Sequence, residues 1–321
     1  MRKNEESKRI HYLAILVSIL LFCSLLLLDI SSAAAEPGSK GVEAVEPVNP
    51  PWPKDAIVAL NDGLCDGNLN GAFFGGSGDT FVMKGGIFTN GCLRGNGSYY
   101  FVYVDHGYVR YVGGTSGPLN FDPDPEQVNI PITEIVDLAE VIQAECDKLP
   151  FYPAVSPIRS AEQTILYPGN YLGSNFIDGA TELKPGLYCV TGNIAINADD
   201  HVTGTDVTIF LTGGSVSING GASLVLSAPQ QEIGPLNIFR HLLFYVKEGN
   251  VTWNSGSDHH AAGRVYVPEG KIALSGNSAL GATFLNTQFV GWNVEVTGNA
   301  TIEIFPEFLD DPLPFVESNH P

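Results

Sequence analysis

Positive charge is scarce in this chain. Its 321 residues include 16 lysines and arginines against 35 aspartates and glutamates, which gives a formal net charge of -19 at pH 7. Four of the basic residues, Arg2, Lys3, Lys8 and Arg9, lie within the first nine positions, so the rest is more acidic still. Such a surface repels phosphate groups and therefore argues against nucleic acid as a partner. Solubility is the simplest interpretation of this acidity, and binding of divalent cations is the alternative.

The chain also lacks the short motifs that mark common enzyme sites. There is no Gly-x-Ser-x-Gly, His-Glu-x-x-His or Gly-x-x-x-x-Gly-Lys sequence. The nearest acidic clusters with histidine are Asp105-His106, Asp199-Asp200-His201 and Asp258-His259-His260, and none of them combines an acid pair with a nearby basic subsite at the spacing that two-carboxylate cleavage of an acidic polysaccharide would need. We therefore predict no enzyme and no catalytic residue, and expect these histidines at solvated corners.

Charged residues make up only 16% of the chain and apolar residues 44%, which is enough to build a core. The 36 glycines show no collagen period. Short runs of valine, isoleucine, leucine, phenylalanine and tyrosine lie between them, which is the pattern of strands and turns. We therefore expect an all-β protein.

A phrase recurs five times in the second half of the chain: a glycine, alternating apolar residues, and a corner of asparagine, serine or glycine. Its starts are Gly192, Gly214, Gly249, Gly270 and Gly291, which are 21 or 22 residues apart with one longer interval. A fixed step of this length is typical of stacked repeats, in which each unit buries its apolar face against the next. It predicts a right-handed parallel β-helix, a form of solenoid, and the strands from Ala56 to about Gly117 would be its first coils.

The N-terminal region carries targeting information. Basic residues precede an apolar run from Tyr12 to Leu28, and Ser31 to Ala35 offer a cleavage step before Glu36. We predict a signal peptide or membrane anchor over 1–35, a proline-rich linker over 36–55, a β-helix domain over 56–306, and an acidic, proline-rich tail over 307–321 that would block strand pairing at an open end. Either fate of residues 1–35 places the body outside the cytoplasm.

One helix is expected to interrupt the strands at about 132–148. Apolar residues recur there at helical spacing in Ile135, Leu138, Ala139 and Ile142. The strands Val207–Leu211 and Leu242–Val246 are almost wholly apolar, which suggests that their outer face is covered as well as their inner one. The helix is the candidate cover.

Four cysteines lie outside the N-terminal apolar run: Cys65, Cys92, Cys146 and Cys189. An exported chain with an even number of cysteines is expected to form disulfides, and four cysteines allow three pairings. We favour Cys65 with Cys92 and Cys146 with Cys189, because the members of each pair are neighbours in sequence. Zinc is disfavoured, since no two cysteines are two to four residues apart and no histidine lies beside them.

One fragment resembles half of a calcium loop. Asp66, Asn68 and Asn70 have the spacing of the first ligands, but Ser77 occupies the position of the bidentate glutamate. We predict an ordinary turn beside Cys65 and no cofactor, with calcium as the alternative.

The coil phrases resemble a known group. Leu183–Tyr188, Val207–Leu211, Leu242–Val246, Gly263–Pro268 and Gln288–Ala300 are similar to the exported β-helical region of TadE/TadG-like proteins of tight-adherence (Flp) pilus assembly. The resemblance implies a secreted or membrane-anchored structural or adhesive protein, whose partners would be pilus or cell-envelope components or surface glycans. A weaker resemblance, to ice-binding-like solenoids, rests on the order of coils, one helix and further coils. An enzyme acting on acidic polysaccharides is the remaining alternative.

Overall fold

A computed structural model describes residues 53–66, 70–97, 100–132, 138–152, 164–231, 239–255, 259–276, 283–299 and 301–310. The chain divides into two units, 1–46 and 47–321, and every described residue belongs to the second. The predicted signal peptide or anchor and nearly all of the predicted linker lie outside the described residues, as does Asn68. Within the described ranges, no helix has the length and apolar character needed to cross a membrane.

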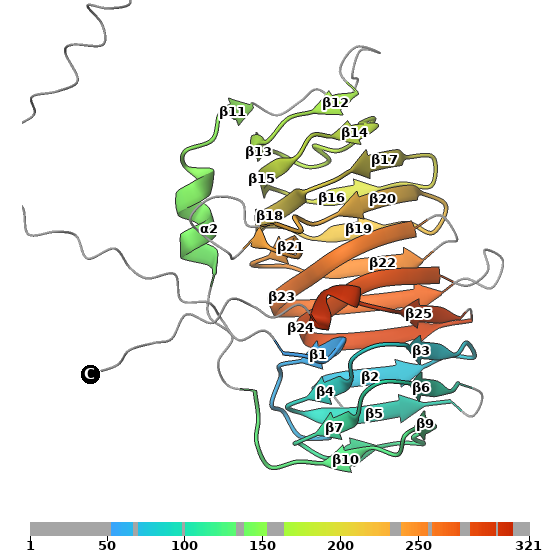
Figure 1. Cartoon of the computed structure of the whole chain (residues 1–321). Helices are drawn as coiled ribbons and strands as arrows, with labels where there is room; N and C mark the ends of the chain where they lie inside the picture. The colour runs from blue at the N-terminus through green and yellow to red at the C-terminus, as the bar shows by residue number, and fades with distance from the viewer. Residues whose placement is uncertain are drawn as a thin grey trace, which may run out of the picture. The chain divides into compact units, whose positions relative to one another are not determined.

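The described chain is built from parallel strands with one α-helix, as expected for an all-β protein (Figure 1). The helix α2 is Ala139–Cys146, and a 3-10 helix, η2, is Glu307–Asp310. The strands are β1 (Ile57–Ala59), β2 (Gly71–Gly75), β3 (Thr80–Val82), β4 (Ile87–Thr89), β5 (Cys92–Asn96), β6 (Val102–Val104), β7 (Val109–Tyr111), β8 (Thr115–Ser116), β9 (Phe121–Asp122), β10 (Glu126–Gln127), β11 (Phe151–Tyr152), β12 (Ile165–Leu166), β13 (Gly169–Leu172), β14 (Glu182–Leu183), β15 (Gly186–Thr191), β16 (Ile194–Ile196), β17 (His201–Gly204), β18 (Val207–Gly213), β19 (Val216–Ile218), β20 (Ser223–Ser227), β21 (Leu242–Val246), β22 (Val251–Ser255), β23 (His259–Gly276), β24 (Thr283–Gly298) and β25 (Ile302–Ile304).

The recurring phrase pairs with its own next copy. Ile194 is the register partner of Val216, Val216 of Val251, Val251 of Ile272, and Ile272 of Val294. The predicted step of 21 or 22 residues with one longer interval is therefore the step between neighbouring parallel strands. These residues are buried and their immediate neighbours are half-buried or exposed, which is the alternation of a strand with one face in a core.

Three sets of strands follow one another along the chain, and we call them faces. The first face contains β11, β13, β15, β18, β21, the middle of β23 and of β24, β1, β4, β7 and β10. The second contains β16, β19, β22, the ends of β23 and β24, β2, β5 and β8. The third contains β12, β14, β17, β20, the starts of β23 and β24, β25, β3, β6 and β9.

The N-terminal strands stack on the C-terminal ones, an order that the repeat did not predict. Ile57 pairs with Phe289, and β25 lies between β24 and β3 on the third face. One turn of the stack therefore consists of β25 from one end of the chain and β1 and β2 from the other. We call this turn the composite coil. The expectation that the tail blocks an open end is wrong, because both edges of β24 and of β25 are already paired.

Close backbone approach seals the composite coil. Gly76 has a φ of +102°, and a Cβ at this position would lie 2.2 Å from the carbonyl oxygen of Gly298. Only glycine meets both demands without strain. At another corner, the side-chain oxygen of Asn293 accepts hydrogen bonds from Gly71 N at 2.8 Å and from Asn61 Nδ2 at 3.1 Å. Both contacts join residues more than 200 positions apart.

A single apolar core runs inside the stack. Its largest side chain, Trp253, is fully buried, meets the rings of Phe244 and Phe289 edge to face, and donates from Nε1 to His259 Nδ1 at 3.1 Å. Tyr188 is also inside, and its hydroxyl donates to main-chain carbonyls; burial raises the pKa of this hydroxyl. The indole N–H of Trp253 and the hydroxyl of Tyr188 thus have hydrogen-bond partners within the core.

The outer side of the first face is covered, as the apolar strands predicted. Phe210, Tyr245 and Tyr266 form a stacked ladder with ring centroids 5.2 and 5.1 Å apart, and all are almost fully buried. They share a second apolar cluster with the N-cap residue Leu138 and with the buried side of α2, which comprises Ala139, Ile142 and Cys146. The helix is shorter than predicted: Ile132 is not helical, and 133–137 lie outside the described residues.

Two disulfides join Cys65 to Cys92 and Cys146 to Cys189, with Cα atoms 5.0 and 5.9 Å apart. This is the pairing favoured by sequence neighbourhood. The first bond lies within the N-terminal strands. The second fastens the end of α2 to β15 on the first face.

Polar and aromatic groups lock the two ends of the chain together. Gln288 Nε2 donates to the carbonyl oxygens of Pro53 and Asp55, and its Oε1 accepts from the buried Arg264. Phe308 of η2 lies between the Arg264 guanidinium, 5.4 Å from the ring centroid, and the ring of His241, stacked at 4.9 Å. Burial lowers the pKa of Arg264. The start of the predicted tail is therefore packed against the strands.

Candidate functional site

A rank of outward side chains crosses the third face, with aromatic rings at its centre. Phe284 pairs with Glu303, Glu303 with Phe81, and Phe81 with Tyr103. On the other side, His260 lies on β23 two residues before Ala262, which is the first β23 residue that pairs with β24, at Asn286. Phe284 is 56% exposed, and the rings of Phe81 and Tyr103 lie 6.1 Å apart. Parallel pairing thus collects aromatic side chains from both ends of the chain.

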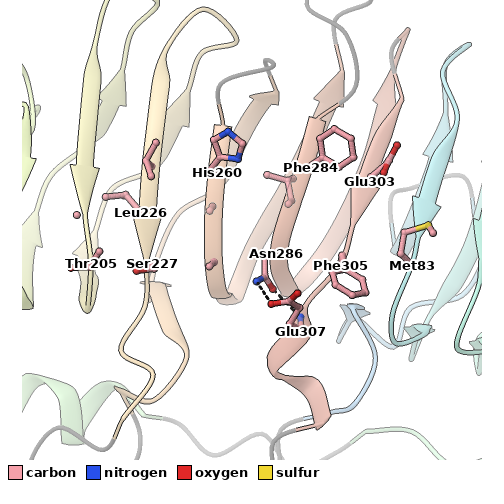
Figure 2. Close-up of a pocket in the computed structure, with 15 residues that line it drawn as sticks. Met83, Thr205, Leu226, Ser227, His260, Phe284, Asn286, Glu303, Phe305 and Glu307 are labelled. Atoms are coloured by element: carbon pink, nitrogen blue, oxygen red, sulfur yellow. Dashed lines mark hydrogen bonds between the residues drawn. The ribbon is translucent and has the colours of Figure 1, made fainter.

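A groove of about 570 Å³ opens beside this rank (Figure 2). We call it the aromatic groove. Phe284 and Phe305 line it, together with small and polar side chains such as Ala262, Ser227 and Asn286. Such a mixture of exposed rings and a few polar groups is common in ligand sites.

Hydrogen bonds fix one wall of the groove. Glu307 N donates to Asn286 Oδ1 at 2.9 Å, and Asn286 Nδ2 lies 3.5 Å from Glu307 Oε2. Lys84 Nζ donates to Glu307 O at 2.7 Å and lies 5.9 Å from the centroid of the Phe305 ring. The wall is therefore preformed by β24, η2 and Lys84, the second residue after β3.

The groove is acidic. Glu303 and Glu307 line it, and Lys84, at its edge, is engaged by the carbonyl of Glu307. The groove also contrasts with the first face, where the aromatic ladder is covered: Tyr245 is 1% exposed, whereas Phe305 is 41% exposed. Rings left open beside carboxylates favour a partner that combines apolar surface with hydrogen-bond donors or positive charge.

The fragment considered for calcium forms a turn closed by its own side chains. Asn70 Nδ2 donates to Asp66 Oδ1 at 2.9 Å and to Leu64 O at 3.1 Å. An amide that donates to the carboxylate turns its nitrogen, and not its oxygen, toward the presumed ligand set. Among the described residues, no group of three or more histidines, cysteines or acidic residues is placed to hold a metal ion.

The histidine fragments belong to different elements: His106 lies between β6 and β7, His201 in β17, and His259 and His260 in β23, while Asp258 lies outside the described residues. His106 and His201 are exposed, as expected, and His106 Nε2 is 3.3 Å from Asp105 Oδ2. The expectation is wrong for His259, which is fully buried and accepts the hydrogen bond of Trp253. Alternation along β23 explains this result: His259 points into the core, whereas His260 points to the aromatic groove.

The groove residues were not identified from the sequence. Phe284 and Glu303 each stand at an outward position of a strand, and that alternation was the available signal. Their assembly with Phe81 and Met83 depends on the composite coil, because β3 lies more than 200 residues away in sequence. Comparisons of the chain with protein-family models, with curated proteins and with solved structures find no match.

Proposed function

We propose that this chain is an exported cell-surface protein with a structural or adhesive role, built as a right-handed parallel β-helix. The step of about 22 residues between neighbouring parallel strands, repeated on three faces, supports the β-helix. The aromatic groove is the observation that carries the adhesive role. The aromatic ladder of the first face is buried, whereas Phe284 and Phe305 on the third face are exposed and accessible to a partner.

Further features support export. Two disulfides in the described chain suit an oxidising compartment, and residues 1–35 have the pattern of a signal peptide or anchor. The partners in this proposal are envelope or pilus components or surface glycans. No catalytic residue, cofactor or metal is part of it.

Cell fractionation combined with thiol labelling tests the export proposal. The full chain should be recovered in the envelope or medium, with Cys65, Cys92, Cys146 and Cys189 inaccessible to a thiol reagent until reduced. A variant without residues 2–35 is the matched control and should remain inside with reactive thiols. Recovery of the full chain in the cytoplasm with four free thiols would contradict export.

Ice binding is a second candidate, favoured by one observation on the second face. The outward rank of Ala195, Ser217, Thr252 and Ala273 is in register over four neighbouring strands and consists of small side chains, which gives a flat surface. A protein that binds ice through this surface should shape growing ice crystals. Substitution of Thr252 by tyrosine should then abolish the effect, and growth of unshaped crystals with the native chain would reject this candidate.

A further inference from the structure

We propose that the aromatic groove binds a linear, β-linked polysaccharide of amino sugars of the glucosamine type. This assignment rests on the proposed surface role and specifies the partner of the same site. It follows from three observations: the spacing of the outward rings Phe284, which lines the groove, and Phe81, which lies beyond Glu303 on β3; the charge of the groove; and the pairing of the strands between these rings.

The spacing of the outward rank suits a linear glycan. Neighbouring strands lie about 4.8 Å apart, so that Phe284 and Phe81, with Glu303 between them, are separated by about 9.6 Å. This is close to the length of one disaccharide in an extended β-linked chain. Alternate sugars can therefore place their apolar C–H faces on successive rings, while the sugar between them lies over the carboxylate.

The charge of the groove selects among glycans. The carboxylates of Glu303 and Glu307 can accept charge-assisted hydrogen bonds from sugar ammonium groups. They would repel uronic acids and sulfated sugars. The Glu307 carboxylate lies 3.5 Å from Asn286 Nδ2, whereas Glu303 is the register partner of Phe284, so Glu303 is the charged contact beside that ring.

The strand pairing disfavours a peptide. An extended peptide commonly binds a sheet by adding a strand to an open edge. Between Phe284 and Phe81, β25 is paired on both sides, with β24 and with β3, and β3 is paired with β25 and with β6. The main-chain groups between these two rings are therefore occupied, and recognition along this part of the rank has to come from outward side chains, as stacking on sugar faces does.

Titration calorimetry of the full, disulfide-bonded chain with a glucosamine hexamer tests the proposal. At about pH 6, where glutamates are ionised and most glucosamine amines are protonated, the hexamer should bind. Phe284→Ala should weaken binding by about three- to tenfold, because a single ring contact of this kind contributes that much. Glu303→Gln should weaken binding by a similar factor, and added salt should diminish the difference from the native chain.

Control ligands and a control variant separate the possible outcomes. Trp292→Ala removes a ring that is 40% exposed outside the groove and should leave affinity unchanged. The N-acetylated hexamer should bind the native chain more weakly than the glucosamine hexamer, and a galacturonate hexamer should not bind. Unchanged affinity in Phe284→Ala, equal binding of all three hexamers, or tighter binding of a lysine-rich peptide would overturn the proposal.

The melting temperature of each variant is measured alongside binding, because exposed positions should leave the fold intact. The two proposals fail in different assays. A chain that binds the hexamer but remains in the cytoplasm contradicts the surface role and leaves the ligand assignment intact. A chain exported with its disulfides that ignores the hexamer contradicts the ligand assignment alone.

Discussion

The N-terminal strands and the C-terminal strands are built differently, although they belong to one stack. Between β1 and β10 the longest strands, β2 and β5, have five residues each. In the C-terminal part β23 has 18 residues and β24 has 16, and both continue through the corners of the stack. The longest strands thus lie beside the composite coil, where the two ends of the chain meet.

This difference indicates where the fold is held together. β24 pairs with β23 on one edge and with β1, β2 and β25 on the other. We call the pairing of β24 with β1, β2 and β25 the junction. The short N-terminal strands pair with a long strand there and would lose that partner if the junction opened. The C-terminal part has further support from α2 and its disulfide. We therefore expect damage at the junction to release the N-terminal strands first.

Removal of a core ring at the junction should have the largest effect. Phe289 is fully buried, pairs with Ile57 of β1, and its ring meets that of Trp253. Phe289→Ala should lower the free energy of unfolding by about 3–5 kcal/mol, because it leaves a cavity in the core. Denaturant titration measures the loss, and limited proteolysis should cut the N-terminal strands before the others. Phe284→Ala, at the exposed end of the same strand, is the control, and an equal loss there would contradict this account.

The two disulfides offer a sharper comparison of the two parts. Replacing both Cys146 and Cys189 by serine should cost about 4 kcal/mol, and replacing both Cys65 and Cys92 about 3.5 kcal/mol, because the longer loop constrains the unfolded chain more. Only the Cys146–Cys189 disulfide holds α2 over the aromatic ladder of the first face. Its removal alone should therefore increase the binding of a hydrophobic dye, and a similar increase in both variants would contradict this division.

Gln288 tests the polar part of the junction. Gln288→Leu retains the size of the side chain, but it removes two hydrogen bonds to the N-terminal segment and the acceptor of Arg264 Nε. We expect a loss of about 2 kcal/mol, because buried polar groups are left without these partners. Gln127→Leu, at an exposed position of β10, should change stability by less than about 0.5 kcal/mol. Equal stability of the two variants would show that the junction does not depend on Gln288.

The smallest expected effect is a pH dependence that arises from Asp55. Burial raises the pKa of this carboxyl above its usual 3.8, although the guanidinium of Arg110, 2.9 Å away, opposes the shift. The folded state then holds the proton more tightly than the unfolded state, so this contribution to stability is complete below pH 3.8 and is lost as the pH rises through the folded value. The native chain should therefore lose stability relative to Asp55→Asn between acidic and neutral pH. Denaturant titrations over that pH range measure the free energies of unfolding of both proteins. A constant difference between the native chain and Asp55→Asn would contradict the prediction.

Much of the fold could be predicted, because its repeat is local. The phrase that begins at Gly214 specifies a strand, a corner and the distance to the next copy, and neighbouring cysteines marked the disulfides. The order of the stack could not be predicted. A repeat gives the step between adjacent strands, but nothing in the sequence around Ile57 or Ile302 specifies that these strands belong to one turn.

The aromatic groove could not be predicted for the same reason. Phe284 and Phe81 look like scattered exposed rings until β25 is placed between β24 and β3. His259 was misplaced because its neighbours are turn residues, and these outweighed the alternation of the following strand. Local composition is therefore a good predictor of the corners, but a poor predictor of burial for residues at the boundary between a corner and a strand.

The composite coil also has a consequence for how the chain acquires its structure. β1 and β2 are synthesised first, but their partner edge on β24 arrives after more than 220 further residues. Contacts so distant in sequence slow folding, and the early strands present unpaired main-chain groups in the interval. Final closure of the molecule must wait for its last strands, and a nascent chain that lacks them is expected to aggregate or to need a chaperone.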